Sequence, residues 1–444
     1  MNDFPRVLFV TPVAFNRISG GGITFSSLFR GWPKQALATV HNDPEPTLDE
    51  VCERYFVLGA GELDFAPPFD HLRRRYRAAS AVSASVPEAA AAGRIEIASR
   101  MKSMALRILG DSFPERARLT PELERWIADY RPQVLYTILG SNGMMSLIEQ
   151  IRRRFELPLV VHVMDDWVAA NHRRGLLGPW QQHQMQRWMQ HFMSIADQCL
   201  GISPAMCDAY GKRYGRIFQP FQNTVDLARW SPFAKATLAS GSPADLLYVG
   251  SIFPNAQLES LVDCCHAVAR LNAEGFAATL TIATPRDHAA RYGGRLAIDP
   301  AVRIEPPIED DEAFFRRIAA ADALLLPVNF DPESVRFIRY SMPTKVPAYL
   351  AVGTPVLAYG PAATAQIDYA LKAGWAEVVD RRDPRDLVEG LRRVITDMEL
   401  RVRLSAGARA AAGRNHDSAR LRAEFGDVLR VSAAKAVQKG VSRQ

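Results

Sequence analysis

One stretch of the chain combines a turn, a helix start and a lysine, which together suit the binding of a phosphate group. It reads Tyr340-Ser-Met-Pro-Thr-Lys345, and the spacing predicts a short helix that opens at Thr344 and ends at Gly353. Free backbone N–H groups and the dipole at a helix start both favour a negative ligand. Lys345 adds a compact positive charge at the same place. The predicted anion site comprises Tyr340, Ser341, Met342, Pro343, Thr344 and Lys345.

Two glycine-containing turns follow strand-like segments and can bring backbone N–H groups close to a ligand. A Gly-Gly-Gly triplet, 20–22, follows residues 6–12, and a Gly-Ser pair follows residues 245–249. Glycine lets the backbone approach a bound group closely. For the triplet, a purely structural turn stays open as the alternative, and it lacks the G-x-G-x-x-G spacing of a dinucleotide site. The predicted ligand contacts are Gly21, Gly22, Gly250 and Ser251.

A pair of acidic residues ends another strand-like segment, residues 158–164. In open α/β sheets, ligands collect at the carboxyl ends of the strands. We therefore take Asp165 and Asp166 as candidate catalytic residues. Two other interpretations stay open, namely that Asp166 caps the following helix and that the pair belongs to a metal site. His162 falls inside the strand, so we expect a core histidine there.

Short apolar segments alternate with longer helical patterns from one end of the chain to the other. Each segment is rich in Val, Ile or Leu and reads as a buried parallel strand. The first set comprises residues 6–12, 38–42, 54–58, 133–139, 158–164 and 198–202. The second set comprises residues 245–249, 278–283, 302–304, 323–328, 355–359 and 376–379. This rhythm predicts two doubly wound α/β domains.

The domain boundaries follow from changes in composition. We expect a first domain over residues 1–228, a Ser/Gly/Pro-rich linker at 239–243, and a second domain over residues 244–415. Residues 67–130 interrupt the first domain with an Ala- and Arg-rich, mostly helical insertion that is too long for an ordinary connection. Residues 416–440 read as a C-terminal helix.

Length, charge and cysteine usage narrow the class of protein. The 444 residues exceed one core and predict about two domains. No apolar run approaches the ~20 residues of a membrane span, and no secretory signal is evident, so we expect a cytoplasmic protein. The net charge of +6 includes arginine runs at 73–77 and 152–154, which are either solvated faces or contacts for anionic lipid or a phosphorylated acceptor. No nucleic-acid module is present, and the five cysteines read as core thiols.

With these motifs assembled, the chain resembles the GT-B glycosyltransferases, in particular the GT4-like retaining enzymes. The resemblance is strongest from Tyr340 to Leu357, and His162-Val-Met-Asp-Asp-Trp167 is similar to an H-x-x-D-D-W segment of that family. It implies two Rossmann-like domains with a cleft between them, and a C-terminal helix that crosses back to the first domain. It also implies a nucleoside diphosphate sugar as co-substrate, no permanently bound cofactor and no metal.

The resemblance implies a reaction in which a sugar moves from the nucleoside diphosphate sugar to a glycan or lipid-linked acceptor, with retention, in surface-polysaccharide synthesis. The diphosphate would lie on the amides of residues 341–344 beside Lys345. Asp165 or Asp166 would face the acceptor or the donor sugar. A peripheral contact with the inner face of the membrane is part of this expectation, and nucleic acid is not.

Three positions depart from the family pattern. The family has Glu in a run that reads roughly P-T-K-x-x-E-Y-L-A, and this chain has Ala348 there. That Glu grips the ribose, and losing such a charge-assisted contact costs about 1.5–3 kcal/mol of binding. Ser251 stands where a phosphate-clamping arginine is common; Arg336 or Arg339 could replace that clamp, and a solvated helix face is the open alternative for both. The acidic position eight residues before the missing Glu is Tyr340, a position that is often non-acidic in relatives that read Y-S-x-P-T-K.

Ala348 leaves three explanations open: a natural variant that binds its donor differently, an inactive partner subunit, or an engineered variant that traps a complex. Two rival functions follow. One is a non-catalytic GT-B protein that binds a glycan or assists a partner transferase. The other is a sugar-nucleotide 2-epimerase, which needs acidic and histidine residues around the sugar ring from both domains.

Overall fold

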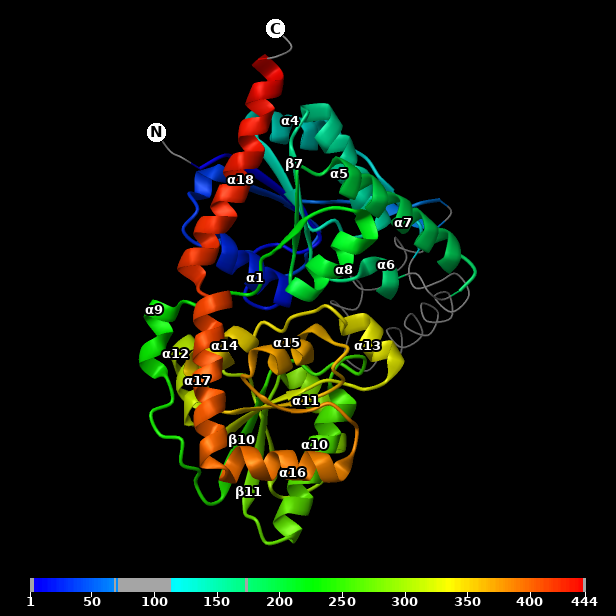
Figure 1. The fold of residues 1–444 in the computed structure, drawn as a ribbon. Helices are drawn as coiled ribbons and strands as arrows, with labels where there is room; N and C mark the ends of the chain where they lie inside the picture. The colour runs from blue at the N-terminus through cyan, green and yellow to red at the C-terminus, as the bar shows by residue number, and fades with distance from the viewer. Residues whose placement is uncertain (1–3, 68, 71–112, 172–174, 442–444) are drawn as a thin grey trace, which may run out of the picture. The chain divides into compact units, whose positions relative to one another are not determined.

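The structure is a computed structural model that describes residues 4–67, 69–70, 113–171 and 175–441 (Figure 1). The chain divides into two compact units. The first unit consists of Met1–Gly201, Cys207–Gln219 and Glu424–Gln444, and the second consists of Ile202–Met206 and Pro220–Ala423. Each unit is built around its own parallel sheet.

The first unit contains a seven-stranded sheet in the order β3-β2-β1-β6-β7-β8-β9. The registers recorded from β3 to β8 are all parallel. The strand order reverses between β1 and β6, which is the switch point where ligands collect in doubly wound sheets. The strands are β1 (Val7–Thr11), β2 (Leu37–His41), β3 (Tyr55–Val57), β6 (Val134–Thr137), β7 (Leu159–Val163), β8 (Gln198–Gly201) and β9 (Phe218–Pro220).

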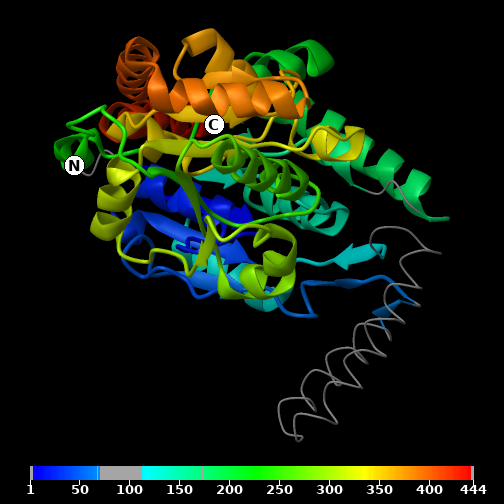
Figure 2. The same cartoon turned by 90° about the horizontal axis from the view of Figure 1, so that it is seen from below.

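Three helices of the first unit, α1, α4 and α5, begin at a side chain that caps their free N–H groups. Ser19, Thr120 and Ser141 accept such bonds at the starts of three helices. A small antiparallel sheet joins β4 (Leu63–Phe65) to β5 (Glu115–Ala117), and Figure 2 shows β5 as a cyan arrow beside the main sheet of this unit. The helices are α1 (Gly20–Phe29), α4 (Pro121–Tyr130), α5 (Asn142–Phe155), α6 (Trp167–Ala170), α7 (Gly178–Ile195) and α8 (Pro204–Tyr214).

The second unit contains a six-stranded parallel sheet in the order β12-β11-β10-β13-β14-β15. Here the order reverses between β10 and β13, so the loops after these two strands are where a ligand is expected. The strands are β10 (Ala244–Val249), β11 (Ala278–Ala283), β12 (Val302–Glu305), β13 (Ala323–Pro327), β14 (Val356–Tyr359) and β15 (Glu377–Val379).

Helices cover this second sheet and bury their apolar faces against it. Helix α10 packs on β11 and β13, α16 packs on β14 and β15, and α14 packs on α17. Asp310, Asp331 and Asp397 cap three of the helices. The helices are α9 (Leu227–Trp230), α10 (Leu258–Ala273), α11 (Arg286–Leu296), α12 (Asp311–Ala320), α13 (Pro332–Ile338), α14 (Val346–Val352), α15 (Ala365–Ala373), α16 (Pro384–Thr396) and α17 (Met398–Asn415).

The last helix, α18 (Ser418–Val441), contributes its residues from Glu424 onward to the first unit. Phe425 is fully buried there, with its ring centroid 5.0 Å from that of Phe29 and 5.4 Å from that of Tyr136. Phe9 lies 4.9 Å from Tyr136 in the same cluster. The predicted return of a C-terminal helix to the first domain is confirmed, and the aromatic cluster gives its physical reason.

The predicted fold class is confirmed: all twelve predicted strands are present and belong to two parallel sheets. Strands β4, β5 and β9 were missed. Each has only three residues, and β9 ends in a proline. The insertion at 67–130 lies mostly outside the described residues, as does the arginine run 73–77; β5 and α4 occupy the described end of the insertion.

Other features of the sequence have clear places in the fold. The cysteines are buried free thiols, as expected. In the run 152–154, Arg152 and Arg153 pair with Glu149, and Arg154 pairs with Glu124, so this part of the basic charge is neutralised locally. Within the described residues, no helix is both long and apolar enough to cross a membrane.

Candidate functional site in the second unit

The loop after β10 is held in a conformation that only glycine adopts easily. Gly250 has a φ of +130°, where side chains of L residues are strained. Its N–H donates to the Ala283 carbonyl at 2.9 Å. The Tyr248 hydroxyl donates to the Ser251 carbonyl at 2.6 Å, and the Ile252 N–H donates to His288 Nδ1 at 2.8 Å. The predicted contacts Gly250 and Ser251 therefore lie in a fixed turn at the switch point of the sheet.

Lys345 reaches this turn from the start of α14. Its Nζ donates to the Val249 carbonyl at 3.1 Å and lies 3.8 Å from the centre of the Tyr248 ring. A Cβ on Gly250 would be 3.6 Å from the same nitrogen, so the lysine head lies directly beside the glycine. The structure thus brings Gly250 and Lys345 together, although 95 residues separate them in the sequence.

The charge of Lys345 has no carboxylate partner among the residues that the structure describes. Burial lowers the pKa of this lysine to about 7, because apolar surroundings disfavour the charged form. The ring of Tyr248 compensates in part through a cation–π contact. An anionic ligand beside this lysine would supply the missing negative charge.

The turn before α14 differs in one detail from the prediction. The helix begins at Val346 and not at Thr344, because Thr344 and Lys345 form a turn in which the Val346 N–H donates to the Pro343 carbonyl. Among the described residues, no partner is recorded for the backbone N–H of Thr344 or of Lys345. The helix ends at Gly353, with φ of +69°, as expected.

Two side chains outside the motif hold this turn in place. Ser203 Oγ donates to the Tyr340 carbonyl at 3.0 Å, and Asn223 Nδ2 donates to the Met342 carbonyl at 2.8 Å. Ser203 also accepts a bond from the Met206 N–H and so caps the start of α8. The sequence did not connect Ser203 or Asn223 to the anion site, since nothing in their local pattern points there.

Ala348 lies on the fully buried helix α14 and is 8% exposed. Its neighbour Tyr349 accepts a hydrogen bond from the Val249 N–H at 3.3 Å, so α14 is tied to the end of β10. Arg339 is exposed and stacks on Tyr340, with its guanidinium carbon 5.5 Å from the ring centre. Among the described residues Arg339 forms no ion pair, so its charge is available to a ligand.

The glycine triplet of the first unit forms the first turn of α1, not a loop before it. Ser19 caps this helix by accepting a bond from the Gly22 N–H at 3.1 Å. A Cβ on Gly22 would lie 2.3 Å from the Asn16 side chain, whose Oδ1 accepts bonds from the N–H groups of Ile18 and Ser19. A side chain at position 22 would therefore clash with Asn16. The buried Asn16 side chain holds the turn before α1 in place, and the sequence alone did not indicate this role. At Gly21 a Cβ would make only ordinary contacts, the nearest at 3.4 Å.

The two acidic candidates at the end of β7 differ in their surroundings. Asp166 is buried, and both of its oxygens accept bonds from Arg213, at 2.8 and 2.9 Å. The Tyr210 hydroxyl donates to Asp166 at 2.9 Å. Asp166 precedes α6 but forms no capping hydrogen bond, so the capping interpretation is wrong. Asp165 is only half-buried. His162 is fully buried and bonds to the Tyr136 hydroxyl at 2.7 Å, as expected of a core histidine.

Comparison with known proteins identifies the architecture. No protein-family model matches the chain, and no curated protein sequence matches it. Solved structures match over nearly its whole length. HepE from Anabaena, in complex with UDP-glucose, has a TM-score of 0.59 at 12% identity and covers 95% of this chain and 98% of its own.

Two further structures agree with this match. Sucrose-phosphate synthase from Thermosynechococcus elongatus has a TM-score of 0.61 at 13% identity and covers 97% of this chain and 100% of its own. WaaG, a glycosyltransferase involved in lipopolysaccharide biosynthesis, has a TM-score of 0.58 at 13% identity and covers 95% of this chain and 99% of its own. The chain therefore has the GT-B fold of these glycosyltransferases.

Proposed function

We propose that this protein is a glycosyltransferase that takes a sugar from a nucleoside diphosphate sugar. The observation that carries the proposal is Lys345, whose ammonium group lies beside Gly250 with no carboxylate partner among the described residues. Gly250 has no side chain that could block a ligand. The backbone N–H groups of Thr344 and Lys345, for which no acceptor is recorded among the described residues, can also donate hydrogen bonds to an anion. The structural neighbours named above include HepE from Anabaena, whose structure is a complex with UDP-glucose.

A diphosphate is the ligand that these groups suit. A lysine ammonium binds phosphate as a point charge, and two adjacent N–H groups donate to phosphate oxygens. In the reaction, negative charge grows on the departing diphosphate as the bond to the sugar breaks. Fixed donors and a cation at that position stabilise the transition state more than the ground state. Ser341, Met342 and Pro343 form the turn that carries these donors, and Arg339 supplies the charge that the family places at position 251.

The acidic pair divides into two roles in this proposal. Both Asp166 oxygens are occupied by Arg213 and Tyr210, so Asp166 positions the end of β7. Asp165 is the residue that orients the acceptor hydroxyl or the donor sugar. Gly21 belongs to the ligand contacts, whereas Gly22 serves the packing of Asn16. We name no protein nucleophile, and the proposed reaction proceeds with retention and without a metal or permanent cofactor.

The proposed acceptor is a glycan or a lipid-linked sugar in surface-polysaccharide synthesis. A cytoplasmic location at the inner face of the membrane would give the enzyme both its nucleotide sugar and a lipid-linked acceptor. The support for this finer step is the resemblance of the motifs and the neighbour WaaG, a glycosyltransferase involved in lipopolysaccharide biosynthesis.

A panel of UDP-, GDP- and TDP-sugars tests the proposal through equilibrium binding and through hydrolysis or transfer. One of the sugars is expected to bind wild-type protein, and Lys345→Met should weaken it at least tenfold. Lys372→Met is the matched control, because Lys372 is an exposed lysine on α15 that pairs with Asp368 and is not part of the proposed site. If no nucleotide sugar binds either the wild type or Ala348→Glu, the enzyme proposal fails.

A second candidate function follows from Ala348, where the family's ribose contact is missing. A non-catalytic partner subunit would bind a nucleotide sugar weakly or not at all and would not turn it over. Ala348→Glu separates the two cases. Activity in the wild type supports the transferase, and activity only in Ala348→Glu supports a chain that has lost its reaction. Analysis of products without acceptor detects a 2-epimerase.

A further inference from the structure

The first unit contains a pocket lined by residues of α5 and α7. We call it the α5–α7 groove; its volume is about 450 Å³, within the range of small-molecule sites. The two helices pack side by side at this place (Figure 1). No residue of the donor site proposed above lines it.

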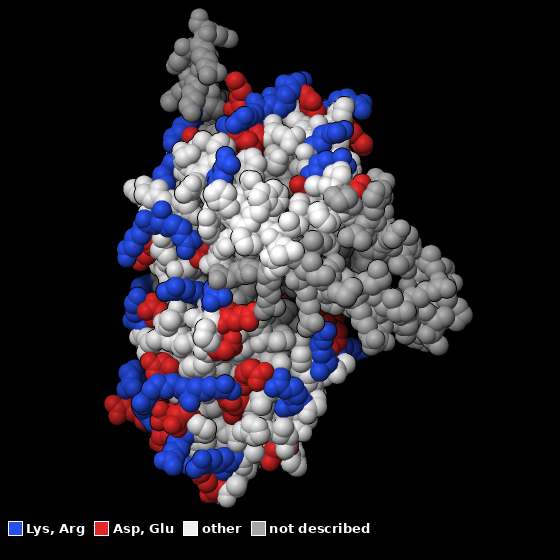
Figure 3. All heavy atoms as spheres, turned by 90° about the vertical axis from the view of Figure 1, so that its right-hand side faces the viewer, with Lys and Arg blue, Asp and Glu red and all other residues white. Residues whose placement is uncertain are grey.

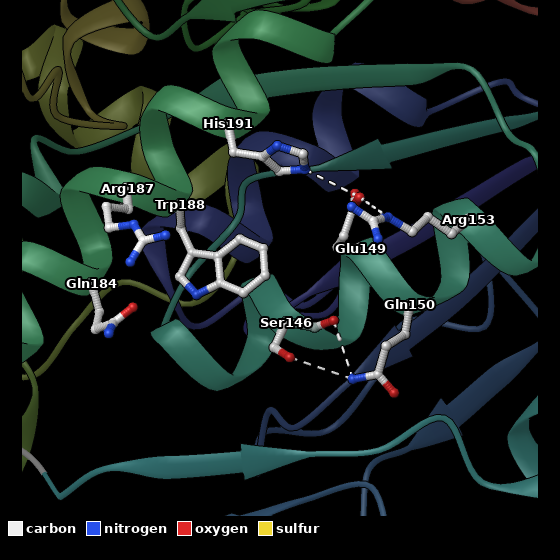
Figure 4. Close-up of a pocket in the computed structure, with 8 residues that line it drawn as sticks. All are labelled: Ser146, Glu149, Gln150, Arg153, Gln184, Arg187, Trp188 and His191. Carbon is white, nitrogen blue, oxygen red and sulfur yellow. Dashed lines mark hydrogen bonds and ion pairs between the residues drawn. The ribbon is translucent and has the colours of Figure 1, made fainter.

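Each helix presents one face to the groove. On α5 the lining residues Ser146, Gln150 and Arg153 are spaced by four and three positions, which places them on a single helix face. On α7 the lining residues Gln184, Trp188 and His191 repeat the same spacing. Figure 4 shows these side chains converging from the two helices, with the Trp188 indole between them.

Trp188 forms a flat apolar surface in the middle of the groove. It is only half-buried, although its ring stacks on Phe192 at 5.8 Å and meets the edge of His191 at 6.0 Å. Amide and hydroxyl groups of Gln184, Gln150 and Ser146 line the groove around it. An aromatic face surrounded by amides and hydroxyls suits a sugar ring, which has an apolar face and a rim of hydroxyl groups.

The charge of the groove favours an anion. Its lining contains one carboxylate, Glu149, and two guanidinium groups, those of Arg153 and Arg187. Glu149 is already paired with Arg152 and Arg153 and lies 3.1 Å from His191 Nε2. Burial alone would raise the pKa of Glu149, but hydrogen bonds from Arg152 and Arg153 more than offset it and lower the pKa to about 2. Both oxygens of Glu149 are thus already engaged by neighbouring side chains.

Arg187 is the uncompensated charge of the groove. It is exposed and forms no ion pair with any residue in the described part of the chain. In Figure 4 it lies on the opposite side of the indole from Arg153. Figure 3 shows basic (blue) and acidic (red) side chains interspersed over the described part of the face that it draws. We therefore expect the groove itself to select an anion.

We propose that the α5–α7 groove binds a saccharide that carries carboxylate or phosphate groups, with a sugar ring on Trp188 and an anionic group on Arg187. This site is separate from the donor site and does not depend on the proposed transferase activity. It gives the first unit a second place to hold an acidic glycan, whether as a segment of a growing chain or as a free ligand.

Equilibrium titration of the full chain, followed by ligand-observed NMR, tests the proposal with matched probes. Trigalacturonic acid should bind at least tenfold more tightly than the neutral maltotriose, and glucose 6-phosphate should bind more tightly than glucose. Inorganic phosphate and triglutamate report simple anion binding and peptide binding. Equal affinity for trigalacturonic acid and maltotriose overturns the proposal, and so does binding of triglutamate as tight as that of trigalacturonic acid.

Variants locate the binding. Arg187→Gln and Trp188→Ala should each weaken trigalacturonic acid about tenfold or more, in line with the loss of a central contact. Arg187 is exposed, so we expect Arg187→Gln to fold. This variant keeps the test usable even if Trp188→Ala fails to fold. Arg154→Gln and Trp180→Ala are the controls, because both residues are exposed and neither lines the groove. The variant Lys345→Met should bind trigalacturonic acid as tightly as the wild type, because Lys345 does not line the groove. If the Arg187 variant binds like the wild type, or Lys345→Met abolishes binding, the ligand is not in this groove.

Discussion

The lowered pKa of Lys345 predicts how the proposed binding of a nucleotide sugar depends on pH. In the free protein the pKa is about 7 because of burial. A diphosphate beside the ammonium group favours the charged form and raises the pKa again. Binding therefore takes up a proton whenever the free lysine is neutral, and the affinity falls as the pH rises above 7.

The size of the effect follows from the two pKa values. If the bound ligand restores the ordinary value of 10.5, the affinity falls about tenfold per pH unit above 7 and about a hundredfold between pH 6 and pH 9. About half a proton is taken up at pH 7 and about 0.9 at pH 8. Tyr248 and Tyr349 do not interfere, because burial raises the pKa of each phenol.

Isothermal titration calorimetry measures this directly. A nucleotide sugar is the suitable ligand, because each of its phosphates has one ester bond and shares the anhydride bond, so that neither phosphate titrates between pH 6 and 9. Titrations at pH 6, 7, 8 and 9 in buffers of different ionisation enthalpy give the affinity and the number of protons taken up. Lys345→Met is the control: its affinity should be low at every pH and independent of pH.

The lowered pKa of Lys345 also predicts how the free energy of unfolding changes with pH. The folded-state pKa lies below the unfolded value, so the unfolded chain binds more protons between about pH 7 and 10.5. The lysine therefore destabilises the fold below pH 7, and this cost disappears as the pH rises toward 10.5. Lys345→Met should raise the free energy of unfolding at pH 6 in urea denaturation.

The calorimetric prediction has its own refuting result. If the wild type binds a nucleotide sugar at pH 8 without taking up a proton, the proposed link between Lys345 and the diphosphate is wrong.

Three further predictions concern stability and reactivity. Asp166→Asn should lower the free energy of unfolding, measured in urea, by about 2–3 kcal/mol. This loss is smaller than that expected for a fully buried ion pair, because the Arg213 side chain is 35% exposed. The control Asp208→Asn, on the surface, should change the free energy of unfolding by less than about 0.5 kcal/mol. Gly250→Ala should lower it by about 1–3 kcal/mol because of its φ of +130°, whereas Gly294→Ala, in open space on α11, should raise it by about 0.5–1 kcal/mol. Burial raises the pKa of Cys265 to about 12, so iodoacetamide should leave it unmodified at pH 8 until urea unfolds the chain.

Much of the fold was predictable because parallel strands buried on both faces leave a strong local signal. Each of the twelve predicted segments is a short apolar run between helical patterns, and each became a strand of the expected sheet. The missed strands β4 and β5 carry no such signal, since their pairing depends on residues 50 positions apart and on one another.

The candidate site was predictable in its residues but not in its connections. The motif itself indicated Lys345 and Gly250, and the sheet order explains why they meet. The bond from Asn223 to Met342 and the pairing of Asp166 with Arg213 join residues that are distant in the sequence. No local spacing encodes such pairs, so the sequence could not indicate that Asp166 is occupied while Asp165 is only half-buried.

Burial lowers the pKa of Lys345, and a glutamate at position 348, where the resembled family has one, would act on the same lysine. A carboxylate at position 348 would lie three residues from Lys345 on α14, where side chains are neighbours. Such a carboxylate would raise the pKa of the lysine and supply part of the negative charge that a ligand otherwise provides. With Ala348 in its place, the charge of Lys345 depends on the bound diphosphate. Ala348→Glu therefore has two effects that one pH series separates: a ribose contact raises affinity at every pH, whereas pairing with Lys345 moves the fall in affinity to a pH above 7.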